Sequence, residues 1–241
     1  WPMDSVQYTL LALRSHLLLQ DEKVAESWNR WLEALHLTPA QQKLDGRVNA
    51  MRMQLPASLE ERQQLFAFHL KEVGDPLHPT ALRWQLKVFE HWQKALNAQA
   101  DALEPEDKSG KKEIEQERMD LLAGIRAQTQ LCKSLYGDHP HPVFAHTRMQ
   151  YALVLHKLGK KATAASDGKI ATKMIMDALG RHHEISLTFR VTLLEILKQS
   201  NEKEYLLSKQ ELLGELEEHL GAFHPLTLQV TEKLSEDKTA D

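Results

Sequence analysis

The stretch Tyr136-Gly137-Asp138-His139-Pro140-His141-Pro142-Val143 joins two segments in which apolar residues recur every three to four positions. Glycine ends a helix by adopting the left-handed conformation, and proline begins the next helix because its φ is already set. The stretch therefore predicts one helix that ends near Gly137 and another that begins near Pro142. Because the connection is short, the two helices must run antiparallel as a hairpin.

Similar junctions occur at three other places in the chain. They read Val73-Gly74-Asp75-Pro76-Leu77-His78-Pro79-Thr80, Leu179-Gly180-Arg181-His182-His183-Glu184-Ile185 and Leu220-Gly221-Ala222-Phe223-His224-Pro225-Leu226-Thr227. From the first junction to the last, the glycines are 63, 43 and 41 residues apart. Self-similarity at about forty residues, with two helices in each period, indicates a solenoid.

Helical periodicity extends over almost the whole chain, and strict apolar–polar alternation is absent, so we expect an all-α fold. Thr38 with Pro39 has the pattern of an N-cap followed by a first helical position, and Ser58 with Glu61 fits a capping box. The predicted helices cover residues 4–19, 22–37, 39–54, 58–73, 80–102, 111–135, 143–158, 161–179, 184–199, 203–219 and 225–235.

The composition excludes several classes of protein. Ten glycines and nine prolines in 241 residues are too few for the turns of a large all-β domain. A formal net charge of −4 argues against nucleic acid or an anionic membrane as the main partner, although a local basic patch stays open. Cys132 is the only cysteine, which excludes a disulfide framework and a Cys-rich zinc site. No apolar run approaches the ~18–20 residues needed to cross a bilayer, so we expect no direct membrane insertion in this segment.

The junctions resemble the LG-x-x-HP punctuation of kinesin-light-chain-type tetratricopeptide repeats (TPR). Within a repeat, the stretch from Tyr151 to Ala164 is similar to the family's LA-x-L-Y-x-x-x-GKYEEA pattern, although Lys161 replaces the usual aromatic residue. The small-residue positions of that pattern are filled by Ala152, Gly159, Ala164 and Ala171. The resemblance is clear over 136–235, weaker over 74–135 and only architectural over 1–73. It implies antiparallel helix hairpins stacked as a TPR-like α-solenoid.

The long first interval predicts one pair of elongated helices, 80–102 and 111–135, joined by a polar turn at 104–112. We expect this hairpin to project beyond its neighbours; the alternative is a disordered insertion. The predicted organisation is N-terminal helical hairpins over 1–73, the elongated hairpin over 74–135, TPR-like repeats over 136–235 and a flexible tail over 236–241.

Residues that could carry chemistry are numerous but do not form a catalytic pattern. Thirteen histidines include the close pairs His139 with His141 and His182 with His183, yet most belong to the junctions, and three or four converging metal ligands are not evident. Phosphate-loop, nucleophile-elbow and His-Glu-x-x-His motifs are absent from the sequence. We therefore expect no catalytic residue, no metal and no cofactor. The tryptophans Trp28, Trp31, Trp84 and Trp92 have the spacing of core residues, and an exposed aromatic clamp is the alternative.

Counting from each junction histidine aligns equivalent positions of the first helices. Position plus five holds Arg83, His146 and Thr188, and position plus nine holds Lys87, Gln150 and Thr192. Residues four apart share a helix face, so these six form a polar stripe. The resemblance implies a peptide groove along it, at the family's Asn positions matching Lys87 and Gln150; the alternative is a solvated face without a ligand. Positions plus ten and plus fourteen are apolar and should face neighbouring helices.

The sequence thus predicts a protein-interaction module, a scaffold or adaptor, that binds a protein or peptide partner. The alternatives are a sensory or regulatory domain of a larger, membrane-tethered signalling protein and, less favoured, an all-helical enzyme. An adaptor predicts an open groove, whereas an enzyme predicts a deep closed pocket with converging titratable groups. Homodimerisation and the cellular compartment are left open. The chain begins at Trp1, so we expect it to be part of a longer protein.

Overall fold

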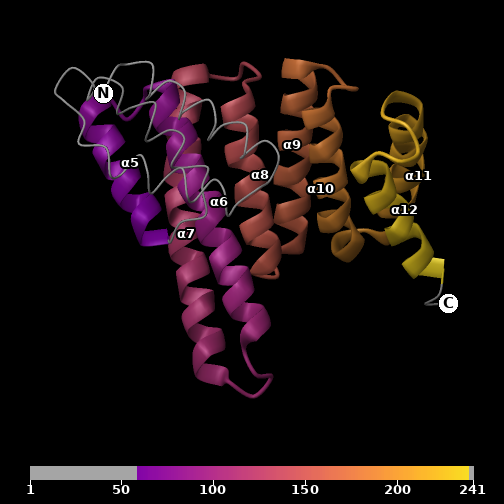
Figure 1. Cartoon of the computed structure of the whole chain (residues 1–241), viewed down its shortest axis with the longest axis horizontal. Coiled ribbons are helices and arrows are strands. Elements are labelled where there is room, and N and C mark those ends of the chain that lie inside the picture. Colours follow the sequence, from indigo (N-terminus) through magenta and orange to yellow (C-terminus); the bar gives the residue numbers. More distant parts are fainter. Residues whose placement is uncertain (1–58, 239–241) are drawn as a thin grey trace, which may run out of the picture. The chain divides into compact units, whose positions relative to one another are not determined.

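The computed structural model describes residues 59–238, and these residues form α-helices without any β-strand (Figure 1). The predicted helices over 4–19, 22–37 and 39–54, the two N-terminal caps, Trp28 and Trp31 lie outside the described residues. The chain divides into two compact units, residues 1–92 and 93–241. This division lies inside one helix, whereas the repeat pattern groups residues 74–135 together.

In the first unit, α5 (Leu59–Val73) is followed by the first part of α6 (Pro79–Ala102). The core of this unit contains Trp84 and Val88, which are buried, with Leu59 and Phe66 packed against them. Trp84 is therefore a core residue, as its spacing predicts. Trp92 is half-buried.

The second unit contains the end of α6 and the helices α7 (Lys108–Tyr136), α8 (Pro142–Lys157), α9 (Lys161–Leu179), α10 (Glu184–Ser200), α11 (Glu202–His219) and α12 (Pro225–Lys238). From α7 onward each helix packs against the next, and α10 also contacts α8 and α12. The described helices begin and end within three residues of their predicted bounds. Residues 236–238, predicted as a flexible tail, are the end of α12.

The predicted elongated pair has 24 residues in α6 and 29 in α7, against 16 to 19 in α8, α9, α10 and α11. The two helices meet at residues 103–107, and their facing ends extend past the end of α8 (Figure 1). Asp107 caps α7 by accepting a hydrogen bond from the Gly110 backbone N–H, so α7 begins three residues before its predicted start. The polar stretch is therefore mostly the first turn of a helix rather than a disordered insertion.

The four junctions share one local geometry. Gly74, Gly137, Gly180 and Gly221 all have positive φ, between 62° and 95°, and a Cβ at these positions would meet no other atom within 4 Å. At Gly137 and Gly180 ψ is −130° and 151°, so these two lie outside the left-handed helical region, in backbone space that is open essentially to glycine alone. The prediction of a glycine with positive φ at each junction is confirmed. The predicted left-handed helical conformation is wrong at Gly137 and Gly180, because their ψ angles lie outside that region.

The junction histidines are helix caps. In each one, ring Nδ1 accepts a hydrogen bond of 3.2–3.3 Å from the backbone N–H two residues later. The first N–H groups of a helix have no partner within the helix, so a side-chain acceptor stabilises that end. The four histidines are His78, His141, His183 and His224, and their donors are Thr80, Val143, Ile185 and Leu226. Proline begins the helix at three of the junctions.

Small residues let the central helices approach closely. Ala152, Ala164 and Ala171 are completely buried, as expected for their place in the repeat. Gly159 instead forms the turn between α8 and α9, with a φ of 73°. The sequence analysis missed Gly168, where a Cβ would lie 3.0 Å from Leu193 Cδ1, so this position sets the approach of α9 to α10.

Candidate functional site

The predicted polar stripe falls into two groups, one in each compact unit. In the first unit Arg83 and Lys87 are exposed on α6, and Lys87 Nζ is 2.7 Å from a carboxylate oxygen of Glu90. In the second unit His146 and Gln150 are half-buried on α8, while α10 presents Thr188 and the half-buried Thr192.

The structure brings the α8 part of this stripe against α10. The His146 and Phe189 rings pack in a T-shaped arrangement, with centroids 4.7 Å apart, and His146 Nδ1 is 2.9 Å from the Pro142 carbonyl oxygen. The hydroxyls of Thr188 and Thr192 donate to the carbonyls one turn earlier on their own helix, at 2.9 Å. Their oxygen atoms keep acceptor capacity only, because a hydroxyl has one proton to donate.

Two hollows lie on a different face of the first helices from this stripe. A hollow of about 510 Å³, here called the upstream groove, lies between α7 and α9 with α8 as its floor. Its charged residues are Arg126 and Lys160, and its lining contains no carboxylate. The residues that line it are Met119, Leu122, Ala123, Arg126, Ala127, Gln130, Tyr151, Leu155, Lys160 and Thr163.

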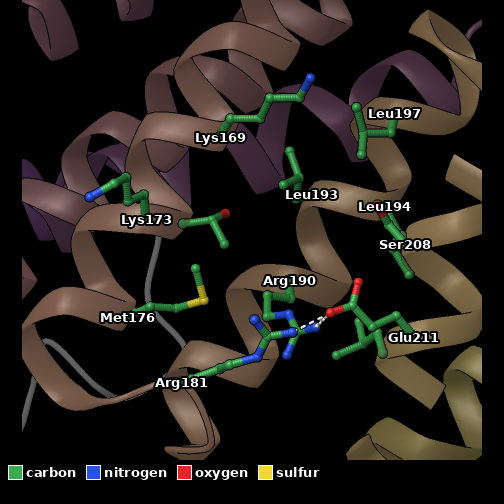
Figure 2. A pocket seen from close by; sticks show the side chains of 12 residues that line it. Lys169, Lys173, Met176, Arg181, Arg190, Leu193, Leu194, Leu197, Ser208 and Glu211 are labelled. Carbon is green, nitrogen blue, oxygen red and sulfur yellow. Dashed lines mark hydrogen bonds and ion pairs between the residues drawn. The ribbon is translucent and has the colours of Figure 1, made fainter. Parts of the chain in front are cut away.

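A second hollow of about 230 Å³, here called the downstream groove, lies between α9 and α11 with α10 as its floor (Figure 2). Lys169 and Lys173 come from α9, and Arg181 and Arg190 converge on the carboxylate of Glu211 in the figure. Its lining residues are Lys169, Thr172, Lys173, Met176, Arg181, Arg190, Leu193, Leu194, Leu197, Ser208, Glu211 and Leu212.

The two grooves occupy the same place in successive repeats. Leu193 and Leu197 on the floor of the downstream groove follow Tyr151 and Leu155 of the upstream groove by 42 residues each. These four residues are the plus-ten and plus-fourteen positions, which were predicted to face neighbouring helices. Leu155 and Leu197 are buried, whereas Tyr151 and Leu193 are half-buried at the bottom of open hollows. None of the six predicted stripe residues lines either groove.

An ion-pair cluster closes one end of the downstream groove. Arg190 Nη1 is 2.5 Å from Glu215, and Arg181 pairs with both Glu215 and Glu211. Hydrogen bonding from Arg190, opposed by burial and assisted by Arg181, lowers the pKa of Glu215 from 4.5 to about 2. Hydrogen bonds to Glu215 and then Glu211 raise the pKa of Arg181. His182 Nδ1 lies 3.5 Å from the Glu215 carboxylate.

The sequence analysis missed this cluster, although the repeat register contains a signal for it. Arg148 and Arg190 both stand seven residues after a junction histidine. Arg148 reaches the second helix of its own repeat, where its guanidinium is 3.7 Å from Asp167. Burial raises the pKa of Asp167, and the charge of Arg148 opposes that effect. Each of these arginines therefore ties the first helix of a repeat to the second.

The histidines do not gather into a metal centre in the part of the chain that the structure describes, since residues 59–238 hold no group of three or more His, Cys, Asp or Glu placed for a metal ion. The rings of His182 and His219 pack against each other with centroids 3.9 Å apart. Cys132 is completely buried beside Thr147, and burial raises the pKa of its thiol.

No helix between residues 59 and 238 is long and apolar enough to cross a membrane. Comparisons of this chain with protein-family models, with curated proteins and with solved structures gave no match.

Proposed function

We propose that this protein is an interaction module that binds a partner polypeptide along a TPR-like stack of helix hairpins. The stack begins with the repeat punctuated at Gly137 and continues through the junctions at Gly180 and Gly221. In this arrangement the first helix of each repeat is α8, α10 or α12, and the second is α9 or α11. Contacts of α10 with both α8 and α12 agree with a regular stack, because first helices then lie side by side.

The observation that supports this proposal best is the recurrence of one groove at a fixed repeat interval. Two hollows, 42 residues apart in register, each open over a first helix, α8 or α10. Each lies between the helices that precede and follow that first helix in the chain, α7 and α9 or α9 and α11. Both are open, and neither holds an unpaired acid beside a base: the upstream groove is lined by cations without a carboxylate, and Glu211 in the downstream groove is already paired with Arg181. A surface of this kind suits an extended or helical polypeptide better than a reaction that must exclude water.

The predicted polar stripe supplies a second contact surface in this proposal. Gln150 on α8 and Thr188 on α10 lie on adjacent first helices, which are joined by the His146–Phe189 contact. A partner segment lying across both helices would meet the Gln150 amide and the Thr188 hydroxyl oxygen. Lys87, in the other unit, offers the equivalent position on α6.

Photo-crosslinking tests the proposal at defined positions. A photoreactive phenylalanine analogue replaces Gln150 on the stripe, Ala127 in the upstream groove, or Glu218, an exposed α11 residue outside both grooves, as the matched control. The full chain is irradiated in an extract of its source organism. We expect discrete crosslinked polypeptides from Gln150 or Ala127 and much less product from Glu218. Equal and diffuse labelling from all three positions would contradict the proposal.

A double variant tests the stripe separately. Lys87→Glu with Gln150→Ala reverses one charge and removes one amide without touching the grooves. The photoreactive residue then replaces Thr188, on the adjacent first helix, and the variant must keep the helical circular dichroism and the unfolding midpoint of the wild-type protein. If this variant still crosslinks to every partner, the stripe is not the contact surface, and only the grooves remain as candidates.

A further inference from the structure

An ion pair bridges the downstream groove from wall to wall. Lys169 lines this groove from α9, and its Nζ is 2.7 Å from a carboxylate oxygen of Glu204 on α11. Both side chains are part-exposed, at 47% and 34%, so the pair lies at the groove's surface rather than in the core. The bridge satisfies the Lys169 cation within the protein.

The upstream groove has the cation but lacks the carboxylate. Arg126 precedes Lys169 by 43 residues, the same interval that separates Gly137 from Gly180. The residue equivalent to Glu204 is Thr163, 41 positions earlier, which is also the interval between the N-cap residues of α9 and α11. Threonine has no charge, so the upstream groove has a neutral residue at the position where the downstream groove has the anion that pairs with Lys169.

The other cations of the two grooves show the same difference as Lys169 and Arg126: those of the downstream groove are paired with carboxylates, and those of the upstream groove are not, within the described part of the chain. All four cations that line the downstream groove have carboxylate partners, namely Glu204, Asp177, Glu211 and Glu215. In the upstream groove, neither Arg126 nor Lys160 forms an ion pair with any residue of 59–238, and no acidic residue lines the hollow. The unbridged groove is also the larger, at about 510 Å³ against about 230 Å³.

The remaining lining of the upstream groove is apolar. Leu122 and Leu155 are buried beneath it, and Met119 keeps 41% of its surface exposed. Along α7 the lining residues recur at spacings of three and four, from Met119 to Gln130, with Ala123 and Ala127 leaving room at the centre. This row is about 16 Å long, given the helical rise per residue. It is longer than a small carboxylic acid and matches a short peptide segment.

We propose that the upstream groove binds an acidic, apolar segment of a partner polypeptide, whose Asp or Glu carboxylate takes the place at Arg126 that Glu204 takes at Lys169. Lys160 adds a second cation at the opposite wall. A large apolar side chain next to the carboxylate lies over Leu122, Tyr151 and Leu155. This inference rests on the proposed function and specifies the partner's chemistry, because unpaired cations over an apolar floor attract a carboxylate that carries apolar neighbours.

The repeat comparison supplies its own test. Thr163→Glu installs the missing internal carboxylate, and Thr163→Gln is the matched neutral control. Thr163 is exposed in the first turn of α9, where an acidic residue is favourable, so both variants should fold. The probe is a synthetic array of twelve-residue peptides, each with one Asp or Glu beside Leu, Ile, Phe or Trp, and each paired with its Asn or Gln counterpart.

We expect a subset of the acidic peptides to bind the full chain at least about fivefold more tightly than their amide counterparts, as a partly solvent-screened ion pair allows. Thr163→Glu should weaken those peptides by about tenfold, since it both occupies Arg126 and repels the peptide carboxylate, whereas Thr163→Gln should change binding by less than about twofold. Arg126→Gln should abolish the preference for acid over amide, and Arg126→Lys should retain it.

Several outcomes would overturn the inference. The first is that no acidic peptide binds more tightly than its amide counterpart, and the second is that peptides bind equally to Thr163→Glu and Thr163→Gln. The third is that hexanoate competes as well as the best peptide, which would identify a small carboxylic acid as the occupant. A concentration-dependent dimer lost only in Thr163→Glu would identify a second copy instead. Crosslinking from Gln150 is independent of this groove, so the proposed function can survive a failure here.

Discussion

The N-cap at His183 gives the sharpest test of how the junctions work. Ring Nδ1 of His183 accepts a hydrogen bond from the Ile185 backbone N–H at 3.2 Å, which is long for such a bond but within the usual range. The side chain is exposed. Replacing it by alanine therefore removes the acceptor without opening a cavity, and the change in the free energy of unfolding isolates the cap.

The expected magnitude follows from this geometry. Loss of a side-chain cap costs about 0.5–2 kcal/mol, and a long, solvated bond belongs at the lower end, so we expect His183→Ala to destabilise by about 0.5–1 kcal/mol. His183→Asn restores an acceptor in the residue type that caps helices best. It should match or exceed the stability of the wild-type protein.

The assay is equilibrium unfolding in urea, followed by circular dichroism. A cap effect shifts the midpoint and leaves the slope unchanged, because the surface exposed on unfolding is the same. Amide hydrogen exchange adds a local measurement, in which exchange at Ile185 should accelerate in His183→Ala and not in His183→Asn. The reasoning is refuted if alanine is neutral, or if asparagine destabilises as much as alanine.

Three further predictions concern other parts of the fold. Gly180→Ala should destabilise the protein by about 1–3 kcal/mol, because φ of 95° with ψ of 151° suits only glycine. Gly214→Ala, inside α11 with open space around it, should be neutral or stabilise the protein by up to about 1 kcal/mol. The urea midpoints of the two variants compare these effects. Cys132 should react with a thiol reagent only at the rate of unfolding, since the thiol is fully buried and its pKa is raised; fast labelling of the native protein would contradict the fold around α7. Glu215→Gln should cost about 1–2 kcal/mol at pH 7 because it breaks the hydrogen bonds to Arg181 and Arg190. The folded-state pKa of Glu215 is lowered from 4.5 to about 2, so its contribution to the free energy of unfolding is complete above about pH 4.5 and is lost as the pH falls towards 2. If the difference in stability between the wild-type protein and Glu215→Gln stays constant over that pH range, the ion-pair cluster is not formed as described.

The helices of this chain follow from local chemistry and were predictable for that reason. Glycine before the turn, histidine as the cap and proline at the first helical position act within a few residues of one another, so the pattern at Gly137 and Pro142 predicts both helix ends. The roles of single residues were less predictable. Gly159 stands at a position where a small residue was expected between packed helices, but it forms a turn. Gly168 belongs to no motif but lies against Leu193.

The candidate site shows the same limit. The predicted stripe from His146 to Thr192 came from counting along first helices, which gives the face of each helix but not what covers it. Whether Tyr151 or Leu193 meets a neighbour or an open hollow depends on how far apart two second helices lie. That spacing results from contacts between residues far apart in sequence, such as the close approach of the Gly168 backbone on α9 to Leu193 and Ile196 on α10.

The amino-acid sequence by itself determined the helical class of the described residues, the helix boundaries, the recurring junctions and the elongated pair α6 and α7, because each depends on interactions between near neighbours in the chain. Tertiary structure alone decided which of the two equivalent cations, Lys169 and Arg126, has an ion-pair partner. Lys169 meets Glu204 across 35 positions, and Arg126, at the same register one repeat earlier, meets no carboxylate among residues 59–238. An ion pair requires two side chains to converge in space, and the packing of α9 between its neighbours brings Lys169 and Glu204 together although they are far apart in the chain.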